Sequence, residues 1–370
     1  MKFSTSKKQL QSSLLKLSKV IPSRSTLPIL SNVLLSVREN DTILRATDLE
    51  ISLRVKLPTS VERIGEITIP VHSVLGVINE YDEETRLTFE VLENKIIISS
   101  DKGSFEIMGR PAVEFPSEPE KPNNNPININ TSIFNDIINK TIFAVSKDEL
   151  KPALSGVLFQ IKNNSILSVS TDGHRLVKYI RNGLNINFNR DVIIPKKFLS
   201  LISSNLSKTE NINLYINENQ VMVEIGSDVF YSRVIDERFP DFESVIPKDN
   251  NKELIINRLE FLSTVKRVSV LSNKTTKQIT LNLTNDNIKI TTKDNEKSSK
   301  GFENISGSFT GEDLIVGYNA VYLKDILSHL TTDEITIKLN SAISAGLFYP
   351  KEQLKNTDLT MLLMPIRLNN

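Results

Sequence analysis

The chain has 370 residues, of which 39% are apolar and 24% charged, a composition typical of a folded protein with two or three domains. Its 45 Lys and Arg nearly balance its 44 Asp and Glu, and it contains no cysteine, which excludes disulfides, thiolate nucleophiles and cysteine-ligated metals. No run of residues approaches the roughly 18 apolar residues of a membrane span, and the N-terminus lacks an apolar export segment. We therefore expect a cytoplasmic protein.

The first third is predicted to contain two helices among strands. A short strand at residues 1–3 precedes a helix that is capped within Ser4-Thr5-Ser6 and keeps helical apolar spacing as far as Ile21. Alternating runs between residues 33 and 107 predict strands, with a helix at 71–80. Residues 116–126, with four prolines and three consecutive asparagines, predict an extended linker.

The rest of the chain is predicted to repeat this order. Helices are expected at 131–146 and 196–206, and again at 258–271 and 320–330, each pair among strands. Residues 214–223 and 229–234 are predicted to form a hairpin, and 240–251 a second linker.

A sequence repeat supports this organisation. Residues 28–34 recur as residues 152–158 with five identities in seven, and Thr47-Asp48 recurs as Thr171-Asp172 at the same shift of 124 residues. A fainter third copy runs from 278 to 294. Because a repeat of roughly 120 residues is far longer than solenoid units of about 20 to 50, each copy is domain-sized. We predict an α+β chain of three tandem similar domains at 1–120, 127–249 and 252–370, each with two helices against antiparallel sheets.

The basic residues concentrate in the predicted helices. Six helical windows, 2–21, 69–80, 131–146, 195–208, 257–272 and 318–330, contain 13 Lys and Arg against 4 Asp and Glu, and the rest of the chain has 32 against 40. Helices that share one face would make that face basic, and a basic face attracts polyanions by neutralising phosphates. The alternative is that these lysines lie on ordinary solvated helix faces.

One cluster has the residue types of a catalytic site: Thr171-Asp172-Gly173-His174-Arg175. Asp-Gly is also a common turn pair, and Thr47-Asp48 occupies the equivalent place without a histidine, so a structural turn explains Asp172 equally well. A hydrolase would need a further nucleophile or metal set. We find no glycine-rich phosphate loop, and the three histidines, His72, His174 and His329, are too far apart for a metal motif. Ser31 and Ser155 fall in apolar runs that suggest strands. We predict no catalytic residue, metal or cofactor, and a protein that is not an enzyme.

The C-terminal segment 361–368 is unusually apolar. It suits a closing strand in the core, although Pro365 would have to lie at a sheet edge or at the strand's end. Methionines beside an edge also suit an adaptable groove for an apolar peptide.

Several stretches together resemble the bacterial β sliding clamp family, the beta subunit of DNA polymerase III, in order and over essentially the whole chain. They are Met1-Lys2-Phe3, Arg24-Ser25-Thr26-Leu27-Pro28-Ile29-Leu30, Thr47-Asp48-Leu49-Glu50, Thr171-Asp172-Gly173-His174-Arg175-Leu176, Arg238-Phe239-Pro240-Asp241 and Met364-Pro365-Ile366-Arg367-Leu368. The resemblance implies a head-to-tail homodimer, a closed ring of six domains with helices around a central hole.

Such a ring would encircle double-stranded DNA without sequence preference. It would confer processivity on the replicative polymerase and bind linear motifs of the polymerase alpha subunit, the clamp loader, other polymerases and mismatch-repair proteins. The alternative function is direct, non-topological binding of duplex DNA, which predicts one concentrated basic patch.

The resemblance also implies site residues. The peptide-binding groove would comprise Leu154, Thr171, Gly173, His174, Arg175, Leu176, Pro240, Val245, Asn319, Tyr322, Ile343, Leu362, Met364, Pro365, Ile366 and Arg367. DNA contacts would come from Arg24, Lys196 and Lys197, and the dimer interface from Phe105 against Val270 and Leu271. Lys147-Asp148, Pro152-Ala153 and the terminal Asn369-Asn370 depart from the familiar pattern of the family.

Overall fold

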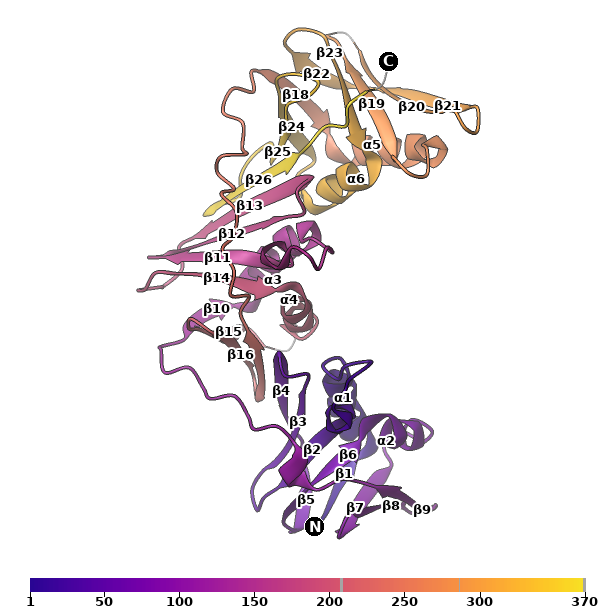
Figure 1. Ribbon diagram of the computed structural model, residues 1–370, viewed down its shortest axis with the longest axis vertical. Helices are drawn as coiled ribbons and strands as arrows, with labels where there is room; N and C mark the ends of the chain where they lie inside the picture. Colours follow the sequence, from indigo (N-terminus) through magenta and orange to yellow (C-terminus); the bar gives the residue numbers. More distant parts are fainter. Residues whose placement is uncertain (207–208, 286, 369–370) are drawn as a thin grey trace. The chain divides into compact units, whose positions relative to one another are not determined.

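The structure, a computed structural model, describes residues 1–206, 209–285 and 287–368. Its elements repeat in three consecutive sets, each with two α-helices among antiparallel strands, as the sequence predicts (Figure 1). The first set is β1 (Lys2–Ser6), α1 (Lys7–Ser18), β2 (Asn32–Val37), β3 (Thr42–Thr47), β4 (Ile51–Lys56), β5 (Ser60–Arg63), β6 (Gly65–Pro70), α2 (Val71–Ile78), β7 (Arg86–Leu92), β8 (Lys95–Ser100) and β9 (Gly103–Met108).

The second and third sets follow the same plan. The second is β10 (Ile127–Asn130), α3 (Thr131–Thr141), β11 (Gly156–Lys162), β12 (Ser165–Thr171), β13 (Arg175–Asn182), β14 (Arg190–Pro195), α4 (Lys196–Ser203), β15 (Asn211–Ile216), β16 (Gln220–Ile225) and β17 (Asp228–Arg233). The third is β18 (Lys252–Asn257), α5 (Arg258–Val268), β19 (Gln278–Leu283), β20 (Ile288–Asp294), β21 (Ser299–Ile305), β22 (Gly307–Thr310), β23 (Leu314–Asn319), α6 (Ala320–His329), β24 (Glu334–Leu339), β25 (Gly346–Pro350) and β26 (Thr357–Leu363).

The chain forms two compact bodies, Met1–Ser132 with Ser200–Val234, and Ile133–Leu199 with Ile235–Asn370. The first body holds a five-stranded sheet, β5-β1-β7-β8-β9, and an eight-stranded sheet, β10-β15-β16-β17-β4-β3-β2-β6. The second body holds a nine-stranded sheet, β14-β11-β12-β13-β26-β25-β24-β18-β22, and a four-stranded sheet, β21-β20-β19-β23. Each large sheet joins consecutive repeats, through β17 with β4 in one and β13 with β26 in the other.

The helices are fixed by caps and by an apolar face that the sequence makes visible. The Ser6 hydroxyl oxygen accepts the Gln9 N–H at the start of α1, and α1 buries Leu10, Leu14 and Leu17 as the spacing predicts. Asn257 caps α5 in the same way. Within its own body, α1 packs on α2 and α5 packs on α6.

Several predicted boundaries are wrong for identifiable reasons. The first strand continues to Ser6, because β1 pairs with β7 along that whole length and with β5 as far as Ser4. The predicted helices at 131–146 and 258–271 end earlier, at Thr141 and Val268, and each is followed by a 3₁₀ turn. Residues 214–223 are not one strand of a hairpin, since residues 217–219 form a turn between β15 and β16.

Ser31 and Ser155 lie in 3₁₀ segments, not in strands. The first segment is Pro28–Ser31, and the second is Pro152–Leu154 with Ser155 at its end. The Ser31 hydroxyl donates to the Pro28 carbonyl over 2.7 Å, and the Ser155 hydroxyl donates to the Pro152 carbonyl over the same distance. The repeated Pro-x-Leu-Ser sequence therefore encodes a repeated turn, in which the proline starts the segment and the serine closes it.

Candidate functional site

The turn from Thr171 to Arg175 joins β12 to β13. The Thr171 hydroxyl donates to the Arg175 carbonyl over 2.7 Å, and Asp172 Oδ1 accepts the backbone N–H groups of His174 and Arg175 at 3.0 and 3.1 Å. Gly173 has a φ of +89°, a left-handed conformation that glycine adopts without strain. Asp172 therefore shapes the turn, as the structural interpretation of this cluster predicts.

Arg175 anchors this turn to the third repeat. Its guanidinium donates to Asp172 Oδ2 at 3.1 Å, to Asp325 Oδ2 of α6 at 2.6 Å and to the Phe143 carbonyl at 2.8 Å. The rings of Phe143 and Tyr322 lie 5.2 and 4.7 Å from its central carbon. Arg175 is only 7% exposed, so these partners compensate for the loss of its hydration.

A second set of contacts binds α3 and its 3₁₀ extension to the end of α6. The His329 ring stacks on Phe143 at 3.9 Å, and its Nδ1 lies 2.7 Å from the Asp325 carbonyl oxygen. Lys140 donates to the His329 carbonyl over 2.6 Å. Burial lowers the pKa of the His329 imidazole and that of the Lys140 ammonium. Both groups belong to the junction between the second and third repeats.

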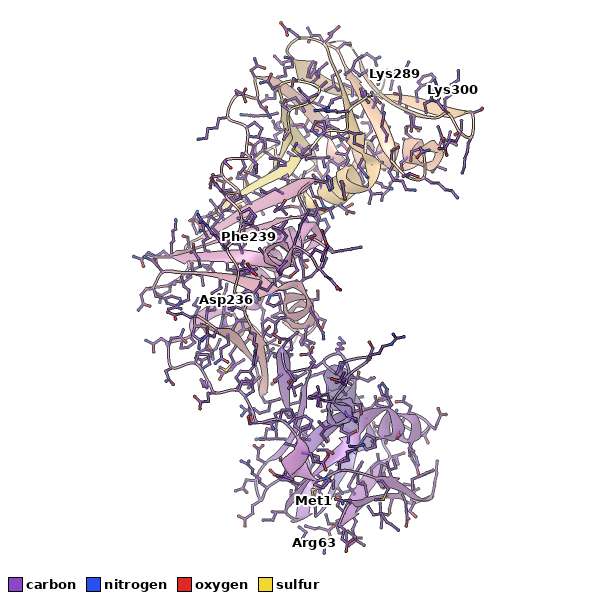
Figure 2. All side chains as sticks on the ribbon, viewed as in Figure 1. Met1, Arg63, Asp236, Phe239, Lys289 and Lys300 are labelled. Carbon is purple, nitrogen blue, oxygen red and sulfur yellow. The ribbon has the colours of Figure 1, made fainter. Side chains whose placement is uncertain are left out.

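An apolar cluster lies under the turn. It joins residues of the second repeat, the following linker and the third repeat, namely Leu158, Val169, Leu176, Ile193, Phe242, Ala345, Leu347 and Leu362. Leu176 and Leu362 face each other in the pairing of β13 with β26. Phe239, which Figure 2 labels on the second linker, packs against the cluster from one side.

Exposed apolar side chains come from the same elements as this cluster. Val245 on the linker is 53% exposed, Ile343 between β24 and β25 is 72% exposed and Met364 after β26 is 41% exposed. Such side chains are candidates for contact with a partner where they gather into one patch.

The first part of the C-terminal segment is a core strand, as the sequence suggests. Met361, Leu362 and Leu363 are buried in β26, which lies between β13 and β25 in the nine-stranded sheet. After the strand ends, the Met364 N–H donates to the His174 carbonyl at 2.8 Å and the Ile366 N–H donates to the Gly317 carbonyl at 2.8 Å. Pro365 therefore lies beyond the ladder, as predicted from its missing donor.

The predicted groove residues are placed as follows. Thr171, Gly173, His174, Arg175, Leu176, Leu362 and Met364 meet through the contacts above, and the His174 ring stacks on Tyr322 at 5.7 Å. Ile366 pairs instead with Gly317 of β23. Asn319 caps α6 by accepting the Val321 N–H. Leu154 is buried in the 3₁₀ turn, while Pro240, Val245, Ile343, Pro365 and Arg367 are placed by the linker, the β24–β25 connection and the C-terminal segment. These sixteen residues are called the candidate peptide site below.

The predicted DNA-binding residues lie on a loop and at a helix start. Arg24 is exposed in the loop after α1, and Lys196 and Lys197 are the first two residues of α4. Burial lowers the pKa of Lys196, and the nearby charges of Lys147 and Arg175 lower it further. Lys147 therefore adds positive charge beside the predicted pair.

Part of the helical excess of positive charge is used inside the fold. Lys16 of α1 pairs with Asp228, Arg267 of α5 pairs with Glu303 at 2.6 Å, and Arg258 donates to backbone carbonyls at the end of α6. These cations are therefore not all available to an external anion.

The predicted interface residues lie at two sheet edges. Phe105 is 44% exposed on β9, an outer strand of the five-stranded sheet. Val270 and Leu271 are 78% and 42% exposed on a 3₁₀ turn beside β21, an outer strand of the four-stranded sheet.

Comparison with known proteins identifies the family. Models of the N-terminal, central and C-terminal domains of the DNA polymerase III beta subunit match residues 1–119, 128–241 and 243–367. The chain belongs to this family. The beta sliding clamp of Pseudomonas putida is 30% identical over 353 residues, which are 94% of this chain and 95% of the relative. That of Vibrio cholerae is 29% identical over the full length of both chains.

Solved structures of the family have the same fold. The sliding clamp of Bacillus subtilis aligns with a TM-score of 0.95 at 27% identity, and both chains are covered completely. The clamp of Pseudomonas aeruginosa bound to griselimycin aligns with a TM-score of 0.93, also at 27% identity and over both whole chains. In this chain, no helix of the described residues is long and apolar enough to cross a membrane.

Reasoning from the sequence missed several residues that the family fold brings together. Phe143, Asp325 and His329 complete the surroundings of Arg175, although Arg175 and Asp325 are 150 residues apart. Met108 on β9 and Phe302 on β21 are 65% and 62% exposed at the two sheet edges. The alternation of both strands was a usable signal for the last two, since each places a large apolar residue on an otherwise polar face.

Proposed function

We propose that this chain is a sliding clamp, which encircles duplex DNA and thereby gives the replicative DNA polymerase its processivity. The observation that supports this most directly is the match to clamps over the whole length, with a TM-score of 0.95. In the proposal, three domains at 1–120, 127–249 and 252–370 form half of a six-domain ring. The protein works in the cytoplasm, uses no cofactor and catalyses no reaction.

The proposed ring closes through the two sheet edges. Strand β9 has no described neighbour on its outer side, and neither has β21, so both present unpaired backbone groups. Large apolar side chains accompany each edge, Phe105 and Met108 on one and Phe302 with Leu271 on the other. Lys289, labelled in Figure 2, lies 4.4 Å from the Phe302 ring centroid. Two different edges give a head-to-tail contact, which becomes a closed ring when the rotation matches.

The interface can be tested by shortening its apolar side chains. Replacing both Val270 and Leu271 by Ala should convert the dimer to a monomer and halve the mass seen by light scattering, because the edge loses its apolar contact. The same replacement at Leu259, which is 54% exposed on α5, should leave the mass unchanged. An unchanged dimer in the Val270/Leu271 variant would count against the assignment.

A ring that encircles DNA does not need strong contacts with it. Arg24, Lys196 and Lys197, with other helical lysines, would contact phosphates without reading bases. Because the ring itself prevents escape, these contacts can be weak enough for the protein to slide.

The candidate peptide site supplies the second half of the function. An apolar cluster with exposed Val245, Ile343 and Met364 beside a polar turn suits a short linear peptide with apolar side chains. The methionine can adapt to different sequences. The proposed partners are the polymerase alpha subunit, the clamp loader, other polymerases and mismatch-repair proteins, which would compete for this site.

Primer extension tests the proposal as a whole. The cognate polymerase and clamp loader, with ATP and a singly primed circular template, should make products much longer in a single binding event when the protein is added. Omission of the loader is the control, since a closed ring cannot thread onto a circle unaided. Product lengths that do not respond to the protein would refute the proposed function.

A further inference from the structure

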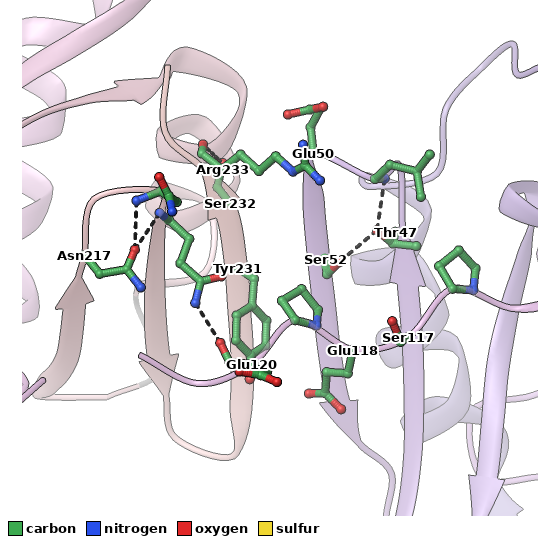
Figure 3. A pocket seen from close by; sticks show the side chains of 15 residues that line it. Thr47, Glu50, Ser52, Ser117, Glu118, Glu120, Asn217, Tyr231, Ser232 and Arg233 are labelled. Atoms are coloured by element: carbon green, nitrogen blue, oxygen red, sulfur yellow. Dashed lines mark hydrogen bonds between the residues drawn. The ribbon is translucent and has the colours of Figure 1, made fainter. Parts of the chain in front are cut away.

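The first body contains a cavity of ≈ 540 Å³ that no part of the proposed function uses. Four segments of the first body line it: the turn after β3, the start of the first linker, the turn between β15 and β16, and the end of β17 (Figure 3). Residues of these segments that matter below are Glu50, Ser52, Glu118, Glu120, Tyr231 and Arg233.

The turn in this cavity repeats the turn of the candidate peptide site. The Thr47 hydroxyl donates to the Ile51 carbonyl at 3.0 Å, as Thr171 does to Arg175. Asp48 Oδ1 accepts the N–H groups of the residues two and three positions later, as Asp172 Oδ1 does. The next residue has a left-handed φ in both turns, +77° at Leu49 and +89° at Gly173.

The strand pairing beside the turn is repeated as well. Ile51 faces Ser232 in the pairing of β4 with β17, and Arg175 faces Leu363 in the pairing of β13 with β26. One residue further on, the Arg233 N–H donates to the Glu50 carbonyl at 2.9 Å. The matching bond runs from the Met364 N–H to the His174 carbonyl at 2.8 Å.

The linkers also correspond. Pro116 in the cavity stands 124 residues before Pro240 of the candidate peptide site, the same shift that relates Thr47 to Thr171. The cavity therefore occupies, at the junction of the first and second repeats, the place that the candidate peptide site occupies at the next junction.

At equivalent positions, the side chains of the first junction are more polar than those of the second. Glu50 replaces His174, Ser52 replaces Leu176, Tyr231 replaces Leu362 and Arg233 replaces Met364. The apolar surface of the second junction thus becomes polar at the first, so an apolar peptide would not suit it.

Carboxylates outnumber cations along the cavity. Glu50, Glu118 and Glu120 line it together with one cation, Arg233. Glu118 lies 3.6 Å from Arg45 and 3.5 Å from Arg54, whereas Glu50 and Glu120 form none of the ion pairs seen among the described residues. Both are exposed, which leaves two carboxylates for a cationic partner.

The linker offers backbone groups to an extended ligand. The Pro116 carbonyl accepts Arg45 at 2.7 Å and the Glu120 carbonyl accepts Gln220 at 2.7 Å, which hold the linker at both ends of this stretch. Between them, the N–H groups of Ser117 and Glu118 have no hydrogen-bond partner within the described residues. An extended peptide can bond such groups as an added strand.

We propose that this cavity is a second docking site, and that it binds an extended basic segment of a protein partner. The inference rests on the proposed peptide binding at the second junction, because the repeated geometry is what relates the two sites. The lysines or arginines of the partner segment would pair with Glu50 and Glu120. Its backbone would form hydrogen bonds with the linker.

The test uses the full chain and two labelled probes. The basic probe is a fluorescein-labelled twelve-residue peptide of alternating Lys and Ser, and the acidic probe has Glu in place of each Lys. The variant of the cavity, called the cleft variant below, carries Glu50→Lys and Glu120→Lys. The control variant carries Glu39→Lys and Glu93→Lys, which reverse two exposed charges in other turns of the same repeat.

The expected result is a loss of roughly tenfold or more in affinity for the basic probe in the cleft variant, against less than about twofold in the control. The acidic probe should bind the unsubstituted chain at least tenfold more weakly. A benzophenone on the basic probe should crosslink to residues 116–120 or 217–220 of the unsubstituted chain, a measurement that needs no variant.

Equal binding by the cleft and control variants would overturn the inference, as would crosslinks confined to other segments or no binding at about 1 mM. A labelled peptide from the cognate polymerase alpha subunit is measured in parallel. If that peptide binds while the basic probe fails, only the second site is refuted. If both fail, peptide binding at the second junction is refuted too.

Discussion

The two junctions between repeats have the same backbone but different side chains. At both, a Thr-Asp turn is followed by a strand that pairs with the last strand of the next repeat in the same register. Below the second turn lies a cluster of eight buried apolar residues, whereas the matching cluster of the first repeat contains Ile29, Leu30, Leu34 and Phe115. The backbone thus fixes where a partner can dock, and the side chains determine its chemistry.

The last residue of the turn illustrates this difference between the junctions. Ile51 at the first junction is 2% exposed and needs no polar partner. Arg175 at the second is also buried, at 7% exposure, and its charge requires Asp172, Asp325 and the Phe143 carbonyl. A buried guanidinium with three partners fixes the position of the elements that supply them, while an isoleucine does not. The second junction therefore holds α6 in a defined place beside the turn.

Deletion of residues 364–370 should have the largest effect and should affect only the second junction. The candidate peptide site loses Met364 and Ile366, so affinity for the polymerase peptide should fall by about 100-fold or more. Binding of the basic probe at the first junction and the mass of the dimer should not change. Fluorescence anisotropy and light scattering give these three results, and a monomeric product would show that the segment is structural instead.

Substituting Asp325 tests whether the Arg175 contacts hold the second junction. Asp325→Asn keeps the volume but removes the charge beside a buried guanidinium, and should lower the free energy of unfolding by about 1 to 3 kcal/mol. Glu334→Gln is the control, because its ion pair with Lys351 is exposed on both sides and should contribute less than about 1 kcal/mol. Urea denaturation measures both. Equal effects would mean that the Arg175 contacts add nothing beyond an ordinary surface pair.

The turn itself can be tested at Gly173. An added Cβ would have no neighbour within 4 Å, so Gly173→Ala introduces only the strain of a left-handed alanine, about 1 to 2 kcal/mol. Gly76→Ala in α2 also meets nothing within 4 Å, but there the helix gains about 0.5 to 1 kcal/mol. Opposite signs of the two changes in thermal denaturation would support the assigned conformation. Stabilisation by Gly173→Ala would contradict it.

The smallest expected effect is a pH dependence at the second junction. Burial holds the pKa of His329 below its usual 6.5, so as the pH falls below about 6.5 the unfolded chain binds the extra proton first. The free energy of unfolding should therefore decrease as the pH falls, by less than the substitutions above change it, and His329→Phe should remove that part of the decrease. His72→Gln, an exposed position, should leave the decrease as it is in the unsubstituted chain. Parallel curves for all three proteins would exclude the assignment.

The sequence predicts those features that depend on neighbours along the chain. The Ser6 cap and the Thr-Asp turn are made by hydrogen bonds between residues at most four positions apart, and the apolar face of α1 depends on a spacing of three to four residues. All three occur as predicted. The repeat extends this to the order of elements in all three sets. Helix ends were predicted less well, because a 3₁₀ turn and a last α-helical turn have the same composition.

The features that the sequence leaves open join distant residues. Nothing near Arg175 indicates that Asp325 will lie 2.6 Å away, and nothing near Lys140 indicates the His329 carbonyl. The resemblance to the clamp family predicted which residues belong to the candidate peptide site, but not the contacts that position them. The cavity at the first junction was also not predicted, because its turn and linker become comparable to those of the second only when the strand register is known.

The measurement that tests the central claim most directly is retention on DNA. The protein is loaded by its cognate loader and ATP onto nicked circular duplex, the circle is cut once, and the protein that remains bound is followed. Loss of the protein upon linearisation is the predicted result, because an encircling ring can slide off a free end. Continued retention on blunt linear DNA would mean that direct contacts hold it, and would contradict the account in favour of a non-topological DNA-binding protein.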